Sequence, residues 1–80
     1  MKKDLRYYMN LSYRIEVIPD TVVGGYTLHC PDLPGCMTCD EDIAQGFEMI
    51  ENAKMNWFMV CLEDEIPIPE PYRIKIPQTA

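Results

Sequence analysis

The feature that most restricts the fold of this 80-residue chain is one amphipathic segment that begins near Asp40 and ends near Glu63. Its apolar residues recur every three to four positions, which predicts one long helix with a single buried face. Asp40 is the expected N-cap, and Glu41 and Asp42 follow it in the first turn. The predicted buried stripe comprises Ile43, Phe47, Ile50, Lys54, Trp57 and Cys61, widened by Ala44, Ala53 and Phe58.

Three short runs ahead of this helix have the patterns of strands. Residues 11–17 alternate between apolar and polar, a second alternating run spans 26–30, and a short third run spans 36–39. Gly24-Gly25 indicates the turn of a hairpin, and Pro31 and Pro34 predict a tight connection where a central strand is excluded. Residues 1–10 are expected to form a short helical turn or an arm. Gly46 inside the helix predicts a close approach of its backbone to the sheet.

A proline-rich linker, residues 66–71, leads to an alternating run from Tyr72 to Ile76, which predicts a fourth strand. The expected fold is α+β in the order β-β-β-α-β, a two-layer domain over residues 1–80 with an antiparallel or mixed four-stranded sheet. One long helix covers one face of the sheet. The other face is exposed or packs against a second subunit, and it presents Arg14, Glu16, Ile18, Thr27, His29, Arg73 and Lys75.

The charge is −6 and is unevenly distributed. From Ile15 to Pro71 the chain has twelve acids and one base, Lys54. This balance argues against direct binding of nucleic acid and suits a basic protein partner, although acids also serve solubility alone. The N-terminal residues lack the apolar region of a signal peptide, and no run is long enough to cross a membrane, so the expected location is the cytoplasm.

The cysteines and the histidine do not form a recognisable chemical site. In a reducing compartment all four cysteines should be free thiols, and Cys36 and Cys39 on one strand should point to opposite faces, which disfavours zinc or redox chemistry. His29 has no nucleophile motif around it. The carboxylates that a two-metal nuclease would need are not expected to converge; they are Glu16, Glu48, Glu51 and Asp64. We therefore predict no metal, no cofactor, no catalytic residue and no enzymatic activity.

Several segments, taken together and in this order, resemble the HicB-like antitoxins of bacterial and archaeal toxin–antitoxin pairs. The resemblance covers roughly residues 12–71. It rests on the first strand, on a helix with Ala44, Glu48, Asn52, Ala53, Lys54 and Trp57, and on the terminal Ile66-Pro67-Ile68-Pro69. The family motif between these parts comprises Gly24, Gly25, Tyr26, Pro31, Asp32, Leu33, Pro34, Gly35 and Cys36.

The resemblance implies a reduced ribonuclease H-like fold and the binding of a HicA-type toxin that cuts messenger RNA. The antitoxin would mask the toxin's RNA-binding and active surface, and it would be a homo-oligomer, a dimer or a tetramer. Many members also carry a C-terminal DNA-binding domain, which is not expected in a chain that stops at Ala80. Cys39 departs from the family, which usually has glycine there. The alternative is a solitary self-assembling domain that has no toxin and binds another protein or a small ligand.

Two candidate contact regions follow from the residues. The first region is the pair of acidic clusters at the two helix ends. They comprise Asp40, Glu41 and Asp42 at the N-terminal end, and Glu63, Asp64 and Glu65 at the C-terminal end. The C-terminal cluster opposes the helix dipole. The second is the loop Pro31–Cys36, which is either a toxin contact or a turn that the fold requires. The prolines, and a positive φ expected at Gly35, favour the turn.

Overall fold

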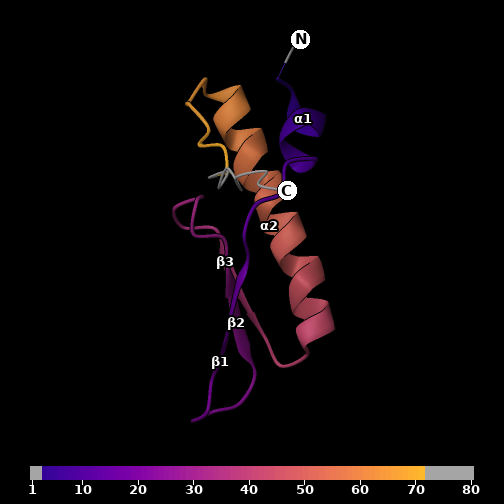
Figure 1. The fold of residues 1–80 in the computed structure, drawn as a ribbon, viewed down its shortest axis with the longest axis vertical. Coiled ribbons are helices and arrows are strands. Elements are labelled where there is room, and N and C mark those ends of the chain that lie inside the picture. The colour runs from indigo at the N-terminus through magenta and orange to yellow at the C-terminus, as the bar shows by residue number, and fades with distance from the viewer. Residues whose placement is uncertain (1–2, 72–80) are drawn as a thin grey trace, which may run out of the picture.

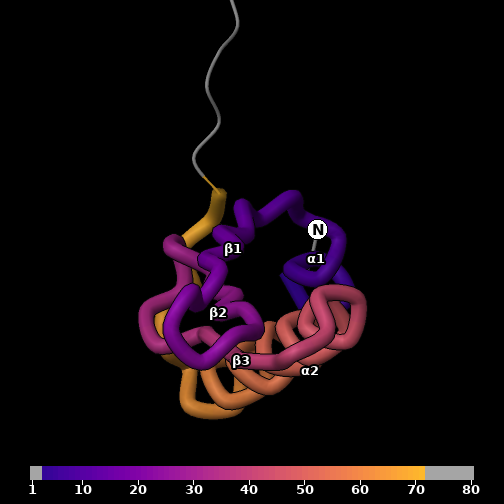
Figure 2. Tube along the Cα trace, turned by 90° about the horizontal axis from the view of Figure 1, so that it is seen from below, coloured from indigo at the N-terminus to yellow at the C-terminus, as the bar shows by residue number. Residues whose placement is uncertain are grey.

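The computed structural model describes residues 3–71 and has two layers (Figure 1). A three-stranded antiparallel sheet forms one layer and a long helix forms the other, which confirms the α+β class. A short N-terminal helix packs beside the C-terminal half of the long one (Figures 1 and 2). In chain order the elements are α1 (Leu5–Met9), β1 (Glu16–Pro19), β2 (Tyr26–His29), β3 (Met37–Asp40) and α2 (Ile43–Glu63).

The strands pair in the order β1-β2-β3, and their register sorts side chains between the two faces. Leu28 at the centre of β2 pairs with Val17 and Thr38, and all three face α2. Glu16, opposite His29, lies on the other face. No described element covers that face, as predicted from one helix covering one side.

Gly46 is the point of closest approach between helix and sheet. A Cβ atom placed on Gly46 would lie 2.7 Å from Leu28 Cδ1, well inside van der Waals contact. Leu28 is itself completely buried, so α2 can pack this close because residue 46 has no side chain. The predicted close approach is confirmed.

The core is centred on Phe58, which an aromatic cluster surrounds. Its ring centroid lies 5.6 Å from that of Tyr8 in α1 and 5.4 Å from that of Tyr13. The predicted stripe was wrong at its N-terminal end, where Ile43 and Phe47 are exposed, Phe47 to 43%. Phe47 lies on the same flank as Phe58 but about three turns earlier, beyond the reach of the five-residue α1.

Strand boundaries differ from the prediction where a partner strand is missing. Residues 11–15 are not paired, because β2 ends at His29 opposite Glu16 and the chain then turns. The third strand is shifted by one residue, to Met37–Asp40, and α2 begins after Asp42 instead of after Asp40. The predicted end of the helix at Glu63 is confirmed.

The described chain ends beside the segment that leads into β1. Tyr13 Oη donates to Pro69 O at 2.6 Å, and Lys3 Nζ and Tyr7 Oη contact the Glu70 carboxylate at 2.7 and 3.0 Å. The predicted fourth strand, 72–76, lies outside the described residues. Neither helix in the described part of the chain is long and apolar enough to span a membrane.

Candidate partner-binding surfaces

The two acidic clusters lie at opposite ends of α2. A helix of 21 residues separates its ends by about 30 Å. The structure therefore does not bring the six predicted partner-binding residues into one site. It makes them two separate surfaces, each beside different neighbours.

At the N-terminal end, two of the three carboxylates have local structural roles. Asp42 is the N-cap of α2, and its Oδ1 accepts from Ala44 N at 2.8 Å and Gln45 N at 3.4 Å. Asp40, the predicted cap, is the last residue of β3, and its Oδ1 accepts from Asp42 N at 2.8 Å. The prediction was wrong because two aspartates that can each cap a helix stand two residues apart, and the end of β3 at Asp40 leaves Asp42 as the cap. Glu41 between them is exposed.

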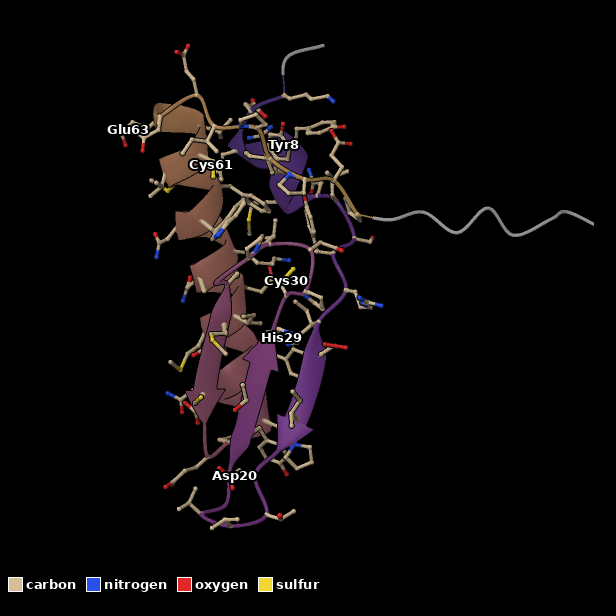
Figure 3. All side chains as sticks on the ribbon, turned by 90° about the vertical axis from the view of Figure 1, so that its left-hand side faces the viewer. Tyr8, Asp20, His29, Cys30, Cys61 and Glu63 are labelled. Atoms are coloured by element: carbon tan, nitrogen blue, oxygen red, sulfur yellow. The ribbon has the colours of Figure 1, made fainter. Side chains whose placement is uncertain are left out.

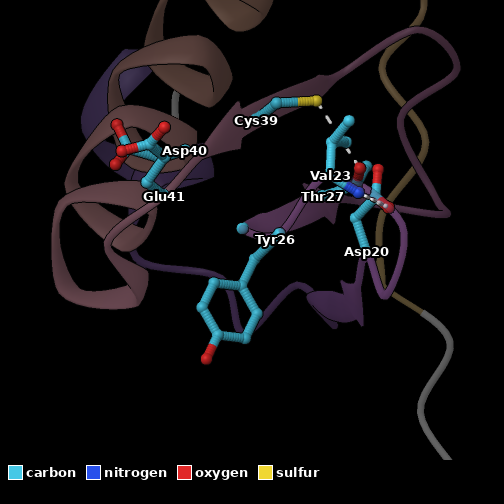
Figure 4. A pocket seen from close by; sticks show the side chains of 9 residues that line it. Asp20, Val23, Tyr26, Thr27, Cys39, Asp40 and Glu41 are labelled. Carbon is cyan, nitrogen blue, oxygen red and sulfur yellow. Dashed lines mark hydrogen bonds between the residues drawn. The ribbon is translucent and has the colours of Figure 1, made fainter.

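The structure places this cluster beside the glycine motif of the hairpin (Figure 4). A pocket of about 360 Å³ lies between Gly24-Gly25-Tyr26 on one side and Asp40 and Glu41 on the other. Gly25 has φ +87°, and a Cβ there would lie 3.1 Å from Asp40 O. Two motifs that are distant in sequence thus form one acidic pocket.

The other acid of this pocket holds the hairpin loop together. Asp20 Oδ1 accepts from Val22 N at 2.9 Å and from Val23 N at 3.1 Å. Both valine side chains are exposed at the tip of the loop. Among residues 3–71, no three His, Cys, Asp or Glu side chains are grouped so that they could hold a metal ion.

The C-terminal cluster closes α2 with a left-handed residue. Ile66 N donates to Cys61 O at 2.8 Å, and Glu65 has φ +55°, the arrangement of a Schellman cap. Glycine is the usual residue at such a position. Glu63, Asp64 and Glu65 are all exposed, and the last turn of the helix contains no base.

The loop Pro31–Cys36 is tied to the core, which supports the interpretation as a turn that the fold requires. Leu33 is completely buried, and Gly35 has the predicted positive φ, +84°. Trp57 Nε1 in α2 donates to Pro34 O at 3.0 Å. Cys30 N donates to Cys36 O at 2.9 Å and closes the loop.

Lys54, the one base between Ile15 and Pro71, is buried, and only 5% of it is exposed. Its Nζ lies 2.9 Å from Glu51 Oε1, and the Tyr13 ring centroid is 5.9 Å away. Sequence reasoning placed Lys54 in the buried stripe but missed its partner, which the i, i+3 spacing could have suggested. As a result, the surface formed by residues 15–71 has acids and no exposed lysine or arginine.

The cysteines lie as predicted from strand alternation. Cys36 is buried, whereas Cys39 is exposed on the other face, with its Sγ 3.5 Å from Thr27 Oγ1. Burial raises the pKa of the Cys30 and Cys36 thiols, which keeps them protonated at neutral pH. These thiols are packing residues of the core.

The candidate catalytic groups do not converge. His29 Nε2 lies 3.3 Å from Glu16 Oε1 on the uncovered face of the sheet. Glu48 is exposed on α2, and Glu51 bonds Lys54. These carboxylates therefore lie on two different faces, whereas two-metal chemistry needs them at one point.

Comparison with known proteins identifies the family of this chain. No curated protein matches the chain. The sequence profile of one family, described as the HicB-like antitoxin of bacterial toxin–antitoxin systems, matches residues 13–79. This match covers the sheet, α2 and both glycine-containing motifs. The chain therefore belongs to the HicB-like antitoxin family.

Proposed function

We propose that this protein binds and neutralises a HicA-type toxin, acting in the cytoplasm by masking the toxin's RNA-binding and active surface and performing no chemistry itself. The observation that carries the proposal is the burial of Lys54 in a member of an antitoxin family. A protein that binds RNA needs a positive surface. The exposed face of residues 15–71 has the opposite sign and suits such a partner by charge complementarity.

The test is co-purification with the protein encoded beside this chain, followed by an RNA cleavage assay. We expect a small basic protein that cuts RNA alone and stops cutting when this chain is added. RNA cleavage that continues at a saturating concentration of the chain would contradict neutralisation. Metal-dependent cleavage by the chain alone would contradict the non-enzymatic role.

The contact surface is tested by neutralising exposed acids whose carboxylates cap neither end of α2. One variant changes Glu63 and Glu65 to Gln, and its matched partner changes Glu41 and Glu48 to Gln, with the same change in charge. We expect the double variant at the helix end that the toxin contacts to bind the toxin about ten-fold more weakly. The double variant at the opposite end should bind it with nearly the affinity of the wild type. Equal affinity of both variants and the wild type would contradict docking through the helix ends.

The proposal includes a fourth strand at Tyr72–Ile76 that completes a reduced ribonuclease H-like fold. Its support is the alternation of apolar residues in that run and the hydrogen bond from Tyr13 to Pro69, which brings the chain beside the approach to β1. Backbone chemical shifts and inter-strand nuclear Overhauser effects of the full chain would test it.

The second candidate function is a solitary self-assembling domain. It is favoured by exposed apolar side chains on α2 and at the edge of the sheet, among them Met37 and Val60. The absence of any co-purifying partner, together with a stable homo-oligomer, would support it over the antitoxin role.

A further inference from the structure

The tip of the hairpin between β1 and β2 exposes two adjacent apolar side chains. Val22 is 91% exposed and Val23 is 83% exposed, whereas Met37, the next most exposed large apolar residue among residues 3–71, is 56% exposed. Neither valine belongs to the core cluster. Turns usually place glycine, proline, asparagine, aspartate or serine at such positions. The fold therefore does not explain why these two residues are valine.

Hydrogen bonds hold this tip in one conformation. The Asp20 carboxylate accepts from the N–H groups of both valines, and the Asp20 main-chain oxygen accepts from Gly24 N at 3.1 Å. Asp20 N in turn donates to Gly25 O at 2.9 Å. Valine is also restricted at χ1, because it is branched at Cβ. A partner that buries the tip would thus immobilise little that is free to move, and a small ordering cost favours binding.

The tip stands at one end of the molecule, beside the acidic pocket. The hairpin loop projects past the N-terminal end of α2 (Figure 1), and Asp20 lies at the end opposite to Glu63 (Figure 3). The backbone at Gly25 approaches Asp40 so closely that a Cβ atom would lie 3.1 Å from Asp40 O. Val23 itself lines the pocket (Figure 4). The apolar tip and the acids beside it therefore form one continuous surface.

The charges around the tip restrict the kind of partner it can meet. Asp20, Asp40 and Glu41 line the pocket beside it, and the described surface between residues 15 and 71 has no exposed lysine or arginine. A second copy of this chain that docked through the tip would bring the same acids face to face, and an anionic lipid surface would also be repelled. A basic protein gains both the apolar contact and the attraction between opposite charges.

We propose that Val22 and Val23 form an apolar anchor by which this chain docks a basic toxin at the N-terminal end of α2. The inference rests on the proposed function, and it selects one of the two helix ends as the contact. The matching surface of the toxin is an apolar hollow bordered by lysine or arginine side chains. Burial of the tip removes more apolar area from water per residue than burial of Val60, which is 55% exposed near the other helix end.

The experiment measures the affinity of full-length variants for the basic protein encoded beside this chain, by isothermal titration calorimetry. The double variant Val22→Thr, Val23→Thr keeps side chains branched at Cβ but places hydroxyl groups in the contact. We expect it to bind the toxin at least about ten-fold more weakly than the wild type, because the buried hydroxyl groups lose their water. Its urea midpoint should not change, since both side chains are exposed. The matched control Val60→Thr should bind the toxin as the wild type does.

A second pair of variants tests the order of the tip. Asp20→Asn removes the charge but keeps an oxygen that can accept from Val22 N and Val23 N, whereas Asp20→Ala removes both the charge and the acceptor. The two variants have the same net charge, so a difference in affinity reports the ordered loop. We expect Asp20→Ala to bind the toxin at least about three-fold more weakly than Asp20→Asn. Equal affinity of the two would contradict a preorganised anchor.

Toxin binding that is unchanged in the double valine variant, or weakened equally by Val60→Thr, would overturn the anchor and leave neutralisation intact. Sedimentation equilibrium gives a separate outcome. A lower molar mass of the double valine variant than of the wild type would assign the tip to contact between copies of this chain, and it would overturn the proposal. If the wild type neutralises no basic protein, the proposed function fails, and this inference fails with it.

Discussion

At the scale of single residues, Gly46 is where a small change should have a large effect. Gly46→Ala gains helix propensity of about 1 kcal/mol. It also forces a methyl group against Leu28 Cδ1 in a closed core, and overpacking costs about 1–3 kcal/mol. We expect the free energy of unfolding in urea to fall by about 1 kcal/mol.

The control for this prediction shortens the facing side chain. In a Leu28→Val background the added methyl group has room, so Gly46→Ala should be neutral or stabilising there. A double-mutant cycle in which the two changes are simply additive would show that the contact between Gly46 and Leu28 does not matter.

Buried thiols should make the fold sensitive to alkali. Burial raises the pKa of Cys30 and Cys36 above the usual 9.0, so the folded chain keeps protons that the unfolded chain loses. The folded state then binds more protons, and stability falls as the pH rises above 9. Tyr13, whose pKa burial also raises, adds to the loss above pH 10.

Urea unfolding at a series of pH values checks this expectation. The free energy of unfolding should be flat near neutral pH and decline above pH 9. The decline should be shallower in Cys36→Ala than in the exposed control Cys39→Ala. A decline of the same slope in both variants would assign the alkaline loss to other groups.

At the scale of elements, replacing Glu65 at the C-terminus of α2 by glycine should stabilise the fold. Glu65 has φ +55°, a conformation that costs an L-residue about 1–2 kcal/mol and costs glycine little. Glu65→Gly should raise the free energy of unfolding by about 1 kcal/mol. Glu63→Gly, two residues earlier inside the helix, should lower it by about 1 kcal/mol. Similar effects of the two changes on the urea midpoint would contradict the Schellman cap.

The helices and strands also show which features of the fold could be predicted from the sequence. Periodicity located α2 and ended it correctly, because apolar spacing and its loss are local signals. The cap was assigned to Asp40 instead of Asp42, since both aspartates suit the N-cap and only the pairing of Asp40 with Tyr26 of β2 shows that the helix begins after Asp42.

The predicted buried stripe lay on the correct face of α2 but extended too far toward the N-terminus of the helix. Phe47 and Phe58 share a flank of α2, and nothing in their local sequence tells which of them the five-residue α1 will cover. The candidate partner surface was predictable as acidic. Its division into two ends, and the pocket that joins Asp40 to Gly25, needed the tertiary structure.

At the scale of the whole molecule, the excess of surface acids should appear in binding kinetics. If a basic toxin docks on this surface, its association rate should fall about ten-fold as salt screens the attraction, while the dissociation rate changes little. Stopped-flow measurements at several salt concentrations would test this. An association rate that does not change with salt concentration would indicate that apolar contacts drive recognition.

Trp57 is the chain's one tryptophan, and its position makes it a built-in optical reporter. Its indole donates to Pro34 O in the loop and lines a groove of about 550 Å³ between Met37 of β3 and Val60 of α2, so its emission senses both the loop and the groove. Filling the groove should shift the fluorescence to shorter wavelength as water leaves the ring. Binding of a partner in this groove could thus be followed in unlabelled protein. A toxin that binds at the N-terminal acidic end of α2, which is distant from Trp57, would leave the signal nearly unchanged.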